Sequence, residues 1–169
     1  PLIGLPYGNA PNRGYRYNSS DTNPPIEITT ASWLPKHIGT HTVTQLGLFS
    51  RTNISKNELI TSYGGLGDIC PTDASAQQTT HHARLMTSLG CPDRYVIDGF
   101  RTPRENFGLA QFCNDKHLTP GSANAKHVPT VDPDQGLGIG LYATRNISPT
   151  EEILINYGTT YWNRIARGH

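Results

Sequence analysis

The sequence has few cysteines, little net charge and no long apolar run, and each absence excludes a class of protein. Cys70, Cys91 and Cys113 have no CxxC spacing, which favours ordinary thiols in a reducing compartment over a disulfide framework. The formal net charge is +1 and the basic residues are scattered, so we expect no direct binding to nucleic acid. No apolar run approaches the ~20 residues of a membrane-spanning helix and no signal-peptide pattern opens the chain, so we expect a soluble protein without a membrane partner.

Glycine and proline, in contrast, are abundant. The 169 residues include 17 glycines and 13 prolines, whereas 35% are hydrophobic and 8% aromatic. This composition favours turns and short strands over long helices. The length fits one domain that buries a core without support from disulfides or metal. We therefore predict a mainly β fold with one or two short helices.

Two stretches of the chain are near copies of one another. The first spans residues 47–64 and the second residues 140–158, and each has an Asn-Ile-Ser turn, a glutamate before aliphatic residues and a final Tyr-Gly. The opening glycines are 93 residues apart and the tyrosines, Tyr63 and Tyr157, are 94 apart, so the second copy has one extra residue near its end. Two units are too few for a solenoid. We predict a pair of related β-arches within one domain.

Four further segments have recognisable patterns. Residues 1–30 are rich in Pro, Gly, Asn, Tyr and Ser without periodicity, which predicts an irregular lead-in with little function. A Ser-x-x-Gln capping box at Ser75 precedes a helical run, so we predict a helix within about 73–90. Residues 95–99 match a buried strand. The loop 114–124 is long, which is typical of functional loops.

Several short pieces of sequence, read in order, carry the most specific pattern in the chain. They are Leu46-Gly47-Leu48-Phe49-Ser50, then Glu58-Leu59-Ile60 with Tyr63-Gly64-Gly65, then Tyr95-Val96-Ile97-Asp98, then Ala110-Gln111-Phe112-Cys113-Asn114-Asp115 with Asn124-Ala125, and finally Glu151-Glu152-Ile153-Leu154-Ile155-Asn156-Tyr157-Gly158 with Tyr161-Trp162. Together they resemble the SET domain of protein lysine methyltransferases across roughly residues 40–163.

The resemblance implies a fold and a division of the chain. The expected fold is the SET-domain β-clip, made of several small sheets with a pseudoknot-like crossing near the C-terminus. The irregular segment 1–30 would precede a single catalytic domain at 31–163, which contains the helical insert at about 73–90. Residues 164–169 would form a tail.

The chain departs from the family pattern at several positions. Gln45 stands where a glycine is usual, Gln111 replaces an arginine, Asp115 replaces a histidine and Ala123 replaces a proline. These changes bear on cofactor affinity more than on the fold. No cysteine follows Cys113, so the cysteine-rich zinc segment that closes the lysine channel in many family members is missing from this sequence.

The resemblance implies transfer of a methyl group from S-adenosylmethionine to a lysine ε-amine by in-line displacement, which leaves S-adenosylhomocysteine and needs no metal. A free lysine has a pKa of about 10.4, so such a site must favour the neutral amine and align it. The resemblance places the hydroxyl of Tyr157 beside the transferring methyl group and makes it the catalytic candidate. The alternative for Tyr157 is a core tyrosine at the end of a strand.

The wall of the lysine channel has three candidates. Tyr63 and Tyr95 would offer ring faces to the lysine stem and ammonium, and ordinary strand packing is the alternative for both. Ile155 occupies a position where an aromatic residue often sets the methylation state. An aliphatic side chain there predicts more than one methyl transfer.

The cofactor has four candidate contacts, Leu46, Gly47, Asn114 and Trp162. The backbone at Gly47, which lacks a Cβ, would permit close approach, and the amide of Asn114 would meet polar atoms of the cofactor. Trp162 would cover the adenine, or would close the apolar edge of the fold. No metal site is predicted, since the adjacent His81 and His82 cannot share an ion as residues four apart on a helix can.

The expected partner is a protein substrate, a histone tail bound in extended form along a strand edge, which implies an intracellular protein located in the nucleus. Acidic residues that could attract a basic tail, or that are simply solvated charges, are Glu105, Asp132, Asp134, Glu151 and Glu152. The lysine channel could be closed by the C-terminal tail at 161–165, by the N-terminal segment or by a second subunit, so a homodimer is one hypothesis. Alternative functions are methylation of a non-histone protein and a catalytically weak SET-like module that binds a peptide or partner.

Overall fold

The protein is a mosaic of short strands in a computed structural model that describes residues 14–31, 37–38, 41–42, 46–69, 83–85, 95–118, 122–132 and 136–166. The strands are β1 (Ile26–Thr30), β2 (His37–Ile38), β3 (His41–Thr42), β4 (Leu46–Ser50), β5 (Leu59–Ser62), β6 (Gly65–Ile69), β7 (Ala83–Leu85), β8 (Tyr95–Gly99), β9 (Asn114–Asp115), β10 (Ala125–Asp132), β11 (Gly136–Ala143) and β12 (Leu154–Ile155). The helical elements are the 3₁₀ helices η3 (Ala110–Phe112) and η4 (Lys116–Leu118) and the α-helix α1 (Thr159–Ala166). The mainly β prediction is confirmed.

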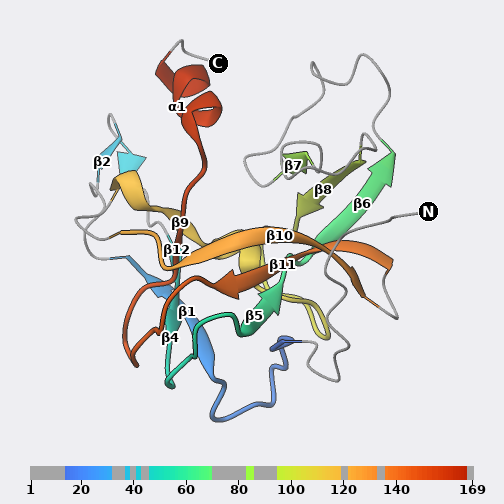
Figure 1. The fold of residues 1–169 in the computed structure, drawn as a ribbon, viewed down its shortest axis with the longest axis vertical. Coiled ribbons are helices and arrows are strands. Elements are labelled where there is room, and N and C mark those ends of the chain that lie inside the picture. The colour runs from blue at the N-terminus through green and yellow to red at the C-terminus, as the bar shows by residue number, and fades with distance from the viewer. Residues whose placement is uncertain are drawn as a thin grey trace.

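The strands form several small sheets. Two are three-stranded, with the orders β10-β11-β5 and β6-β8-β7, and the others are the pairs β1-β4, β12-β9 and β2-β3. In Figure 1, β10 and β11 run across the middle, with β1 and β4 below them and β6, β7 and β8 to the upper right. Parallel pairing of β12 with β9 carries the C-terminal segment past residues 114–115. This is the crossing near the C-terminus that the SET-domain resemblance predicted.

The two repeat copies pair with each other rather than each within itself. Ile54 and Ile147, at the centres of the two Asn-Ile-Ser turns, exchange backbone hydrogen bonds of 3.0 and 2.9 Å. Strand β5 of the first copy pairs with β11 of the second. In return, the backbone N–H of Ile153 in the second copy donates to the carbonyl of Leu48 in the first at 2.7 Å. Each opening strand therefore lies against the closing segment of the other copy.

The core lies where the two copies meet. Leu48, Leu141, Ile147 and Ile153 each expose 1% of their surface or less and belong to one hydrophobic cluster. Burying an aliphatic side chain of this size stabilises a fold by about 1.5–3 kcal/mol. The repeat therefore forms the packed body that holds Tyr63 and Tyr157, whose rings pack against the same cluster.

The N-terminal segment is more ordered than the sequence predicted. Residues 26–30, expected to be irregular, form β1 and pair along their whole length with β4. Tyr15 makes a bridge to Thr61, and Tyr15 and Tyr17 pack against the core. The prediction was wrong here because the alternating, β-branched Ile-Glu-Ile-Thr-Thr favours a strand, while the composition of the preceding residues suggested disorder. Residues 1–13 lie outside the described part of the chain.

The helix predicted within about 73–90 is wrong at the residues that the structure describes there. Ala83–Leu85 form β7, which pairs antiparallel with residues 96–98 of β8. Pairing with β8, the next strand along the chain, outweighs the local helical preference. The capping box at Ser75 and the remainder of this segment lie outside the described residues. The strand predicted at 95–99 is confirmed as β8.

The C-terminal end of the described chain is helical. Helix α1 continues to Ala166, past the predicted domain boundary at 163, because the residues after Gly158 contain neither proline nor glycine until Gly168. It lies at the top of the view in Figure 1, beyond β12. Among the described residues, no helix is long and apolar enough to cross a membrane.

Candidate active site

Tyr157 follows β12 and is held by residues at β9, the strand that pairs with β12. Its hydroxyl donates a hydrogen bond to the carbonyl of Cys113 at 2.7 Å, and its backbone N–H donates to Oδ2 of Asp115. The residue is half-buried and its ring meets the ring of Tyr161 edge to face, with centroids 4.7 Å apart. Both the backbone and the hydroxyl of Tyr157 are therefore fixed by residues 113–115.

The surroundings of Tyr157 keep its phenol neutral. Burial raises its pKa well above the ordinary value, and the Cys113 thiol, the Tyr161 and Tyr63 phenols and the Asp115 carboxylate raise it further. Burial likewise raises the pKa of the Cys113 thiol, with a smaller contribution from Glu152. Around neutral pH the phenol therefore acts as a fixed hydrogen-bond donor and dipole, not as a phenolate base.

Tyr63, the repeat partner of Tyr157, packs against the same hydrophobic cluster. Its phenol is close enough to contribute to the pKa shift of Tyr157. Its backbone N–H donates to the carbonyl of Ile139 at 2.7 Å, and its ring meets that of His127 edge to face with centroids 5.4 Å apart. The structure therefore brings together two tyrosines that are 94 residues apart in the sequence.

The other two channel candidates are positioned by strands. Ile155 lies in β12, two residues before Tyr157, and is 2% exposed. Tyr95 begins β8, where its backbone pairs with Ile69. The side chain of Tyr95 lies outside the described part of the structure.

Three of the cofactor candidates meet at the start of β4. Nδ2 of Asn114 donates to the carbonyl of Leu46 at 3.1 Å and to Oε1 of Glu152 at 2.9 Å. A Cβ atom on Gly47 would lie 2.6 Å from Oε1 of Glu152. The protein's own side chains therefore pack closely around this glycine, a feature that the sequence did not reveal. Leu46 is 40% exposed.

A cleft with a volume of about 360 Å³ opens between η4 and α1. This is within the range of pockets that hold small ligands. Its lining residues are Lys116, His117, Asn156, Thr159, Trp162 and Asn163. Of these, the sequence singled out Trp162 alone. The ring of Trp162 lies 5.7 Å from that of His117, centroid to centroid.

His117, a residue that the sequence analysis missed, is held by Asp115. Oδ1 of Asp115 accepts hydrogen bonds from the backbone N–H of His117 at 2.6 Å and from its ring Nδ1 at 2.7 Å. An aspartate that accepts from the backbone two residues later forms a common turn. The Asp-x-His spacing is therefore the signal in the sequence that could have indicated this contact.

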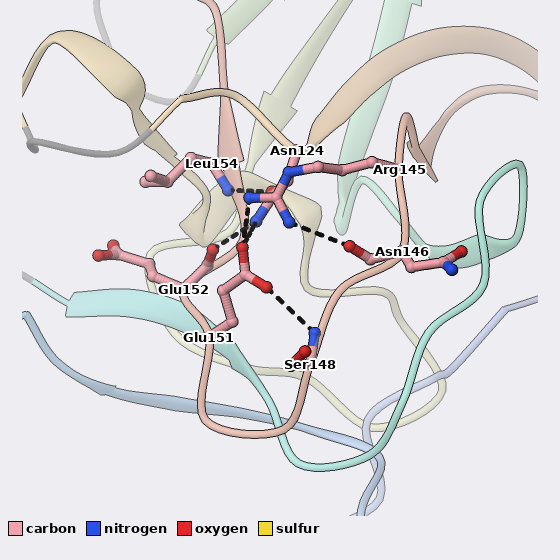
Figure 2. A network of polar contacts seen from close by, with 7 residues as sticks. All are labelled: Asn124, Arg145, Asn146, Ser148, Glu151, Glu152 and Leu154. Atoms are coloured by element: carbon pink, nitrogen blue, oxygen red, sulfur yellow. Dashed lines mark hydrogen bonds and ion pairs between the residues drawn. The ribbon is translucent and has the colours of Figure 1, made fainter.

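A network of polar contacts holds the segment that leads into β12, the strand of the C-terminal crossing. Asn124 is fully buried, and its Nδ2 donates to the carbonyl of Glu152 at 2.8 Å while its Oδ1 accepts from the N–H of Leu154 at 2.8 Å. Figure 2 shows Glu151 between Asn124, Arg145 and Ser148. Glu151 and Glu152, named above for attracting a basic tail, thus hold the scaffold together. Asp134 lies outside the described residues.

Gln111, which departs from the family pattern, also has a structural role. Its Oε1 accepts a hydrogen bond from the backbone N–H of Gly64 at 2.8 Å, and the side chain is 6% exposed. At Gly64, a Cβ would lie 2.2 Å from the carbonyl oxygen of Gly108. The hydrogen bond to Gln111 therefore holds the segment that follows Tyr63 in place.

Comparison with known proteins agrees with the geometry. The SET domain pattern matches residues 45–158, about two thirds of the chain. The chain belongs to the SET-domain family. This confirms the resemblance to SET-domain protein lysine methyltransferases that the sequence pieces indicated. Among solved structures, it is similar to a Plasmodium falciparum protein described as a "putative histone methyltransferase", with 21% identity, a TM-score of 0.49 and coverage of 81% of this chain and 96% of that one. No curated protein sequence matches the chain.

Proposed function

We propose that this SET-domain protein transfers methyl groups from S-adenosylmethionine to a lysine ε-amine of a protein. The observation that carries the proposal is the state of Tyr157, a neutral phenol held at its backbone and hydroxyl by residues 113–115. S-adenosylmethionine supplies the methyl group, and S-adenosylhomocysteine leaves. The scheme needs no metal ion.

The cleft between η4 and α1 fits the adenosyl part of the cofactor. Its volume of about 360 Å³ accommodates a nucleoside, and the rings of Trp162 and His117 offer apolar faces. Nε1 of Trp162 is buried without a hydrogen-bond partner among the described residues, a donor that a purine nitrogen would satisfy. In the same proposal the backbone at Leu46 and Gly47, with Asn114, holds the methionyl part.

The lysine channel is proposed to run past Tyr63, Tyr95 and Ile155 to the hydroxyl of Tyr157. Aromatic walls stabilise the lysine stem and its cationic forms, and the fixed phenol oxygen orients the neutral amine for in-line attack. The aliphatic side chain of Ile155 leaves room for a methylated amine, which supports more than one transfer.

Closure of the channel is proposed to come from the chain itself. Helix α1 brings the ring of Tyr161 edge-on to Tyr157, in the region where many family members use a zinc segment. This contact favours the C-terminal segment over a second subunit. A histone tail in the nucleus is the proposed substrate and location.

Calorimetric titration with S-adenosylmethionine, followed by transfer of a labelled methyl group to a histone mixture and to a lysine-rich non-histone protein, tests the proposal. We expect cofactor binding and labelling of histone lysines. Absence of binding heat overturns the proposal. Binding without transfer identifies a catalytically weak peptide-binding module, and labelling of the non-histone protein alone replaces the histone assignment.

The cofactor cleft is tested separately at Trp162. Trp162→Ala should weaken cofactor binding by about tenfold, the effect of losing an aromatic contact and a hydrogen bond. Trp162→Phe keeps a ring but removes the Nε1 donor and should fall between the alanine variant and the wild type. Equal affinity of all three proteins in the calorimeter would place the adenosyl group elsewhere.

A further inference from the structure

One buried carboxylate touches both the cofactor cleft and the catalytic tyrosine. Within the described part of the chain, Asp115 is the only acidic or basic residue in the buried class, with 0% exposure. Its Oδ1 holds His117 in the wall of the cleft through two hydrogen bonds of 2.6 and 2.7 Å. Its Oδ2 accepts the backbone N–H of Tyr157.

The three donors around Asp115 explain how the carboxylate is tolerated in the interior. A buried charge destabilises a fold unless hydrogen bonds compensate for the lost water, and hydrogen bonds to an ionised acceptor are short and strong. Since the donors come from η4 and from the segment after β12, they link two parts of the fold through one rigid group. A displacement of His117 therefore moves the Asp115 carboxylate, which in turn is hydrogen-bonded to the backbone N–H of Tyr157.

We propose that Asp115 is a positioning residue that couples occupation of the cofactor cleft to the placement of the Tyr157 hydroxyl. The inference rests on the proposed function. Asp115 stands where the family pattern has a histidine, so this coupling is a property of the present chain. Its carboxylate also contributes to the raised pKa of the Tyr157 phenol, after the larger effects of burial, Cys113, Tyr161 and Tyr63.

Two variants separate the two contacts of the Asp115 carboxylate, with His117 in the cleft wall and with the backbone of Tyr157. His117→Ala removes the contact between Asp115 and the cleft, and we expect the dissociation constant of S-adenosylmethionine to rise about tenfold and kcat at saturating cofactor to fall about threefold, because the contact of Asp115 with Tyr157 remains. Asp115→Asn keeps the shape but puts an amide donor against one of the existing donors. It should weaken cofactor binding to a similar degree and also lower kcat at saturation by at least about tenfold.

Glu58→Gln is the matched control. Oε2 of Glu58 accepts the backbone N–H of Ser55 at 2.9 Å in an exposed turn, so this variant makes the same carboxylate-to-amide change at a comparable contact away from the cleft. We expect it to leave both cofactor affinity and kcat unchanged.

Nuclear magnetic resonance gives a readout without turnover. Titration of the ¹⁵N-labelled wild type with S-adenosylhomocysteine should shift both the His117 signals and the backbone amide of Tyr157. In Asp115→Asn the Tyr157 amide should lose most of this shift and exchange its hydrogen faster. If Asp115→Asn fails to fold, His117→Ala decides, because coupling requires that it too suppresses the shift at Tyr157.

The outcomes separate the inference from the proposed function. A wild-type protein that neither binds cofactor nor transfers methyl groups overturns the proposed function, and the coupling with it. Two results overturn the coupling alone when the wild type is active. One is a normal kcat in Asp115→Asn, and the other is a Tyr157 amide signal in the wild type that does not shift when S-adenosylhomocysteine is added.

Discussion

The first repeat copy, residues 47–64, and the second, residues 140–158, share the geometry of their turns. Asn57 and Thr150 occupy matching turn positions, and both have φ of 69°. A glutamate side chain accepts a backbone N–H in each turn, Ser55 to Glu58 at 2.9 Å and Ser148 to Glu151 at 3.1 Å. The same pattern of residues therefore folds the same way twice.

The two copies differ in the backbone contacts of their tyrosines. Tyr63 continues the antiparallel pairing with β11 and donates to the carbonyl of Ile139. Tyr157 comes one residue later in its copy, after a parallel pairing with β9, and donates to the carboxylate of Asp115. The symmetric part of the repeat is scaffold, and the candidate active site lies where the second copy leaves the symmetry.

The largest difference between the copies should appear when each tyrosine loses its hydroxyl. In Tyr157→Phe we expect kcat to fall by about 10²–10³, the usual effect of removing one preorganised polar group at the reacting centre. Tyr63→Phe should lower kcat by less than about tenfold, because its hydroxyl would line the channel without contacting the methyl group. Steady-state assays on variants with wild-type circular dichroism measure both. Equal losses would assign the two phenols equal roles.

The glycines after the tyrosines should differ next. A Cβ at Gly64 would meet the Gly108 carbonyl at 2.2 Å, whereas Gly158 has φ of 87° with nothing within 4 Å of a Cβ. We expect Gly64→Ala to lower the free energy of unfolding by about 3 kcal/mol through overpacking. Gly158→Ala should cost about 1 kcal/mol of backbone strain. Urea denaturation compares them, and the reverse order would contradict the packing described around Gly64.

The smallest difference concerns the turn glutamates. The hydrogen bond from Arg145 holds the pKa of Glu151 below its usual 4.5, against the effect of burial, and Ser148 and Asn124 lower it further. Glu151 therefore stabilises the fold fully above about pH 4.5, and this contribution is lost as the pH falls through the lower folded-state pKa. Glu151→Gln should cost about 1 kcal/mol at pH 7 and flatten the stability profile below pH 4.5.

Glu58→Gln provides the comparison for that profile. Its single contact lies in an exposed turn, so we expect a loss of about 0.5 kcal/mol or less. Thermal unfolding of both variants between pH 3 and 7 measures the difference. Identical profiles would mean that the network of Figure 2 adds nothing to the symmetric turn.

Much of the scaffold could be predicted from the sequence because its signals are local. The Asn-Ile-Ser turns, the alternating apolar residues and the strand at 95–99 each follow from neighbouring residues, and the SET-domain pieces added the crossing. Tyr63 and Tyr157 could be paired because the repeat itself relates them.

The remaining features depend on contacts that neighbouring residues in the sequence do not indicate. Nothing in the run around Ala83–Leu85 indicates a partner at residues 96–98, so the helical preference misled. The cleft could not be predicted because η4 and α1, about 40 residues apart, form its two walls. The close packing around Gly47 could not be predicted either, since Asn114 and Glu152 reach it from elsewhere in the chain.

The exchange of strands between the copies has a consequence for synthesis. β5 has no partner until β11 (Gly136–Ala143) has left the ribosome, and β4, although paired with β1, lacks its contact with Ile153 until later still. Contacts of such long sequence separation slow folding. We therefore expect the nascent N-terminal half to remain incomplete during translation, and two separately expressed halves to acquire structure only when mixed.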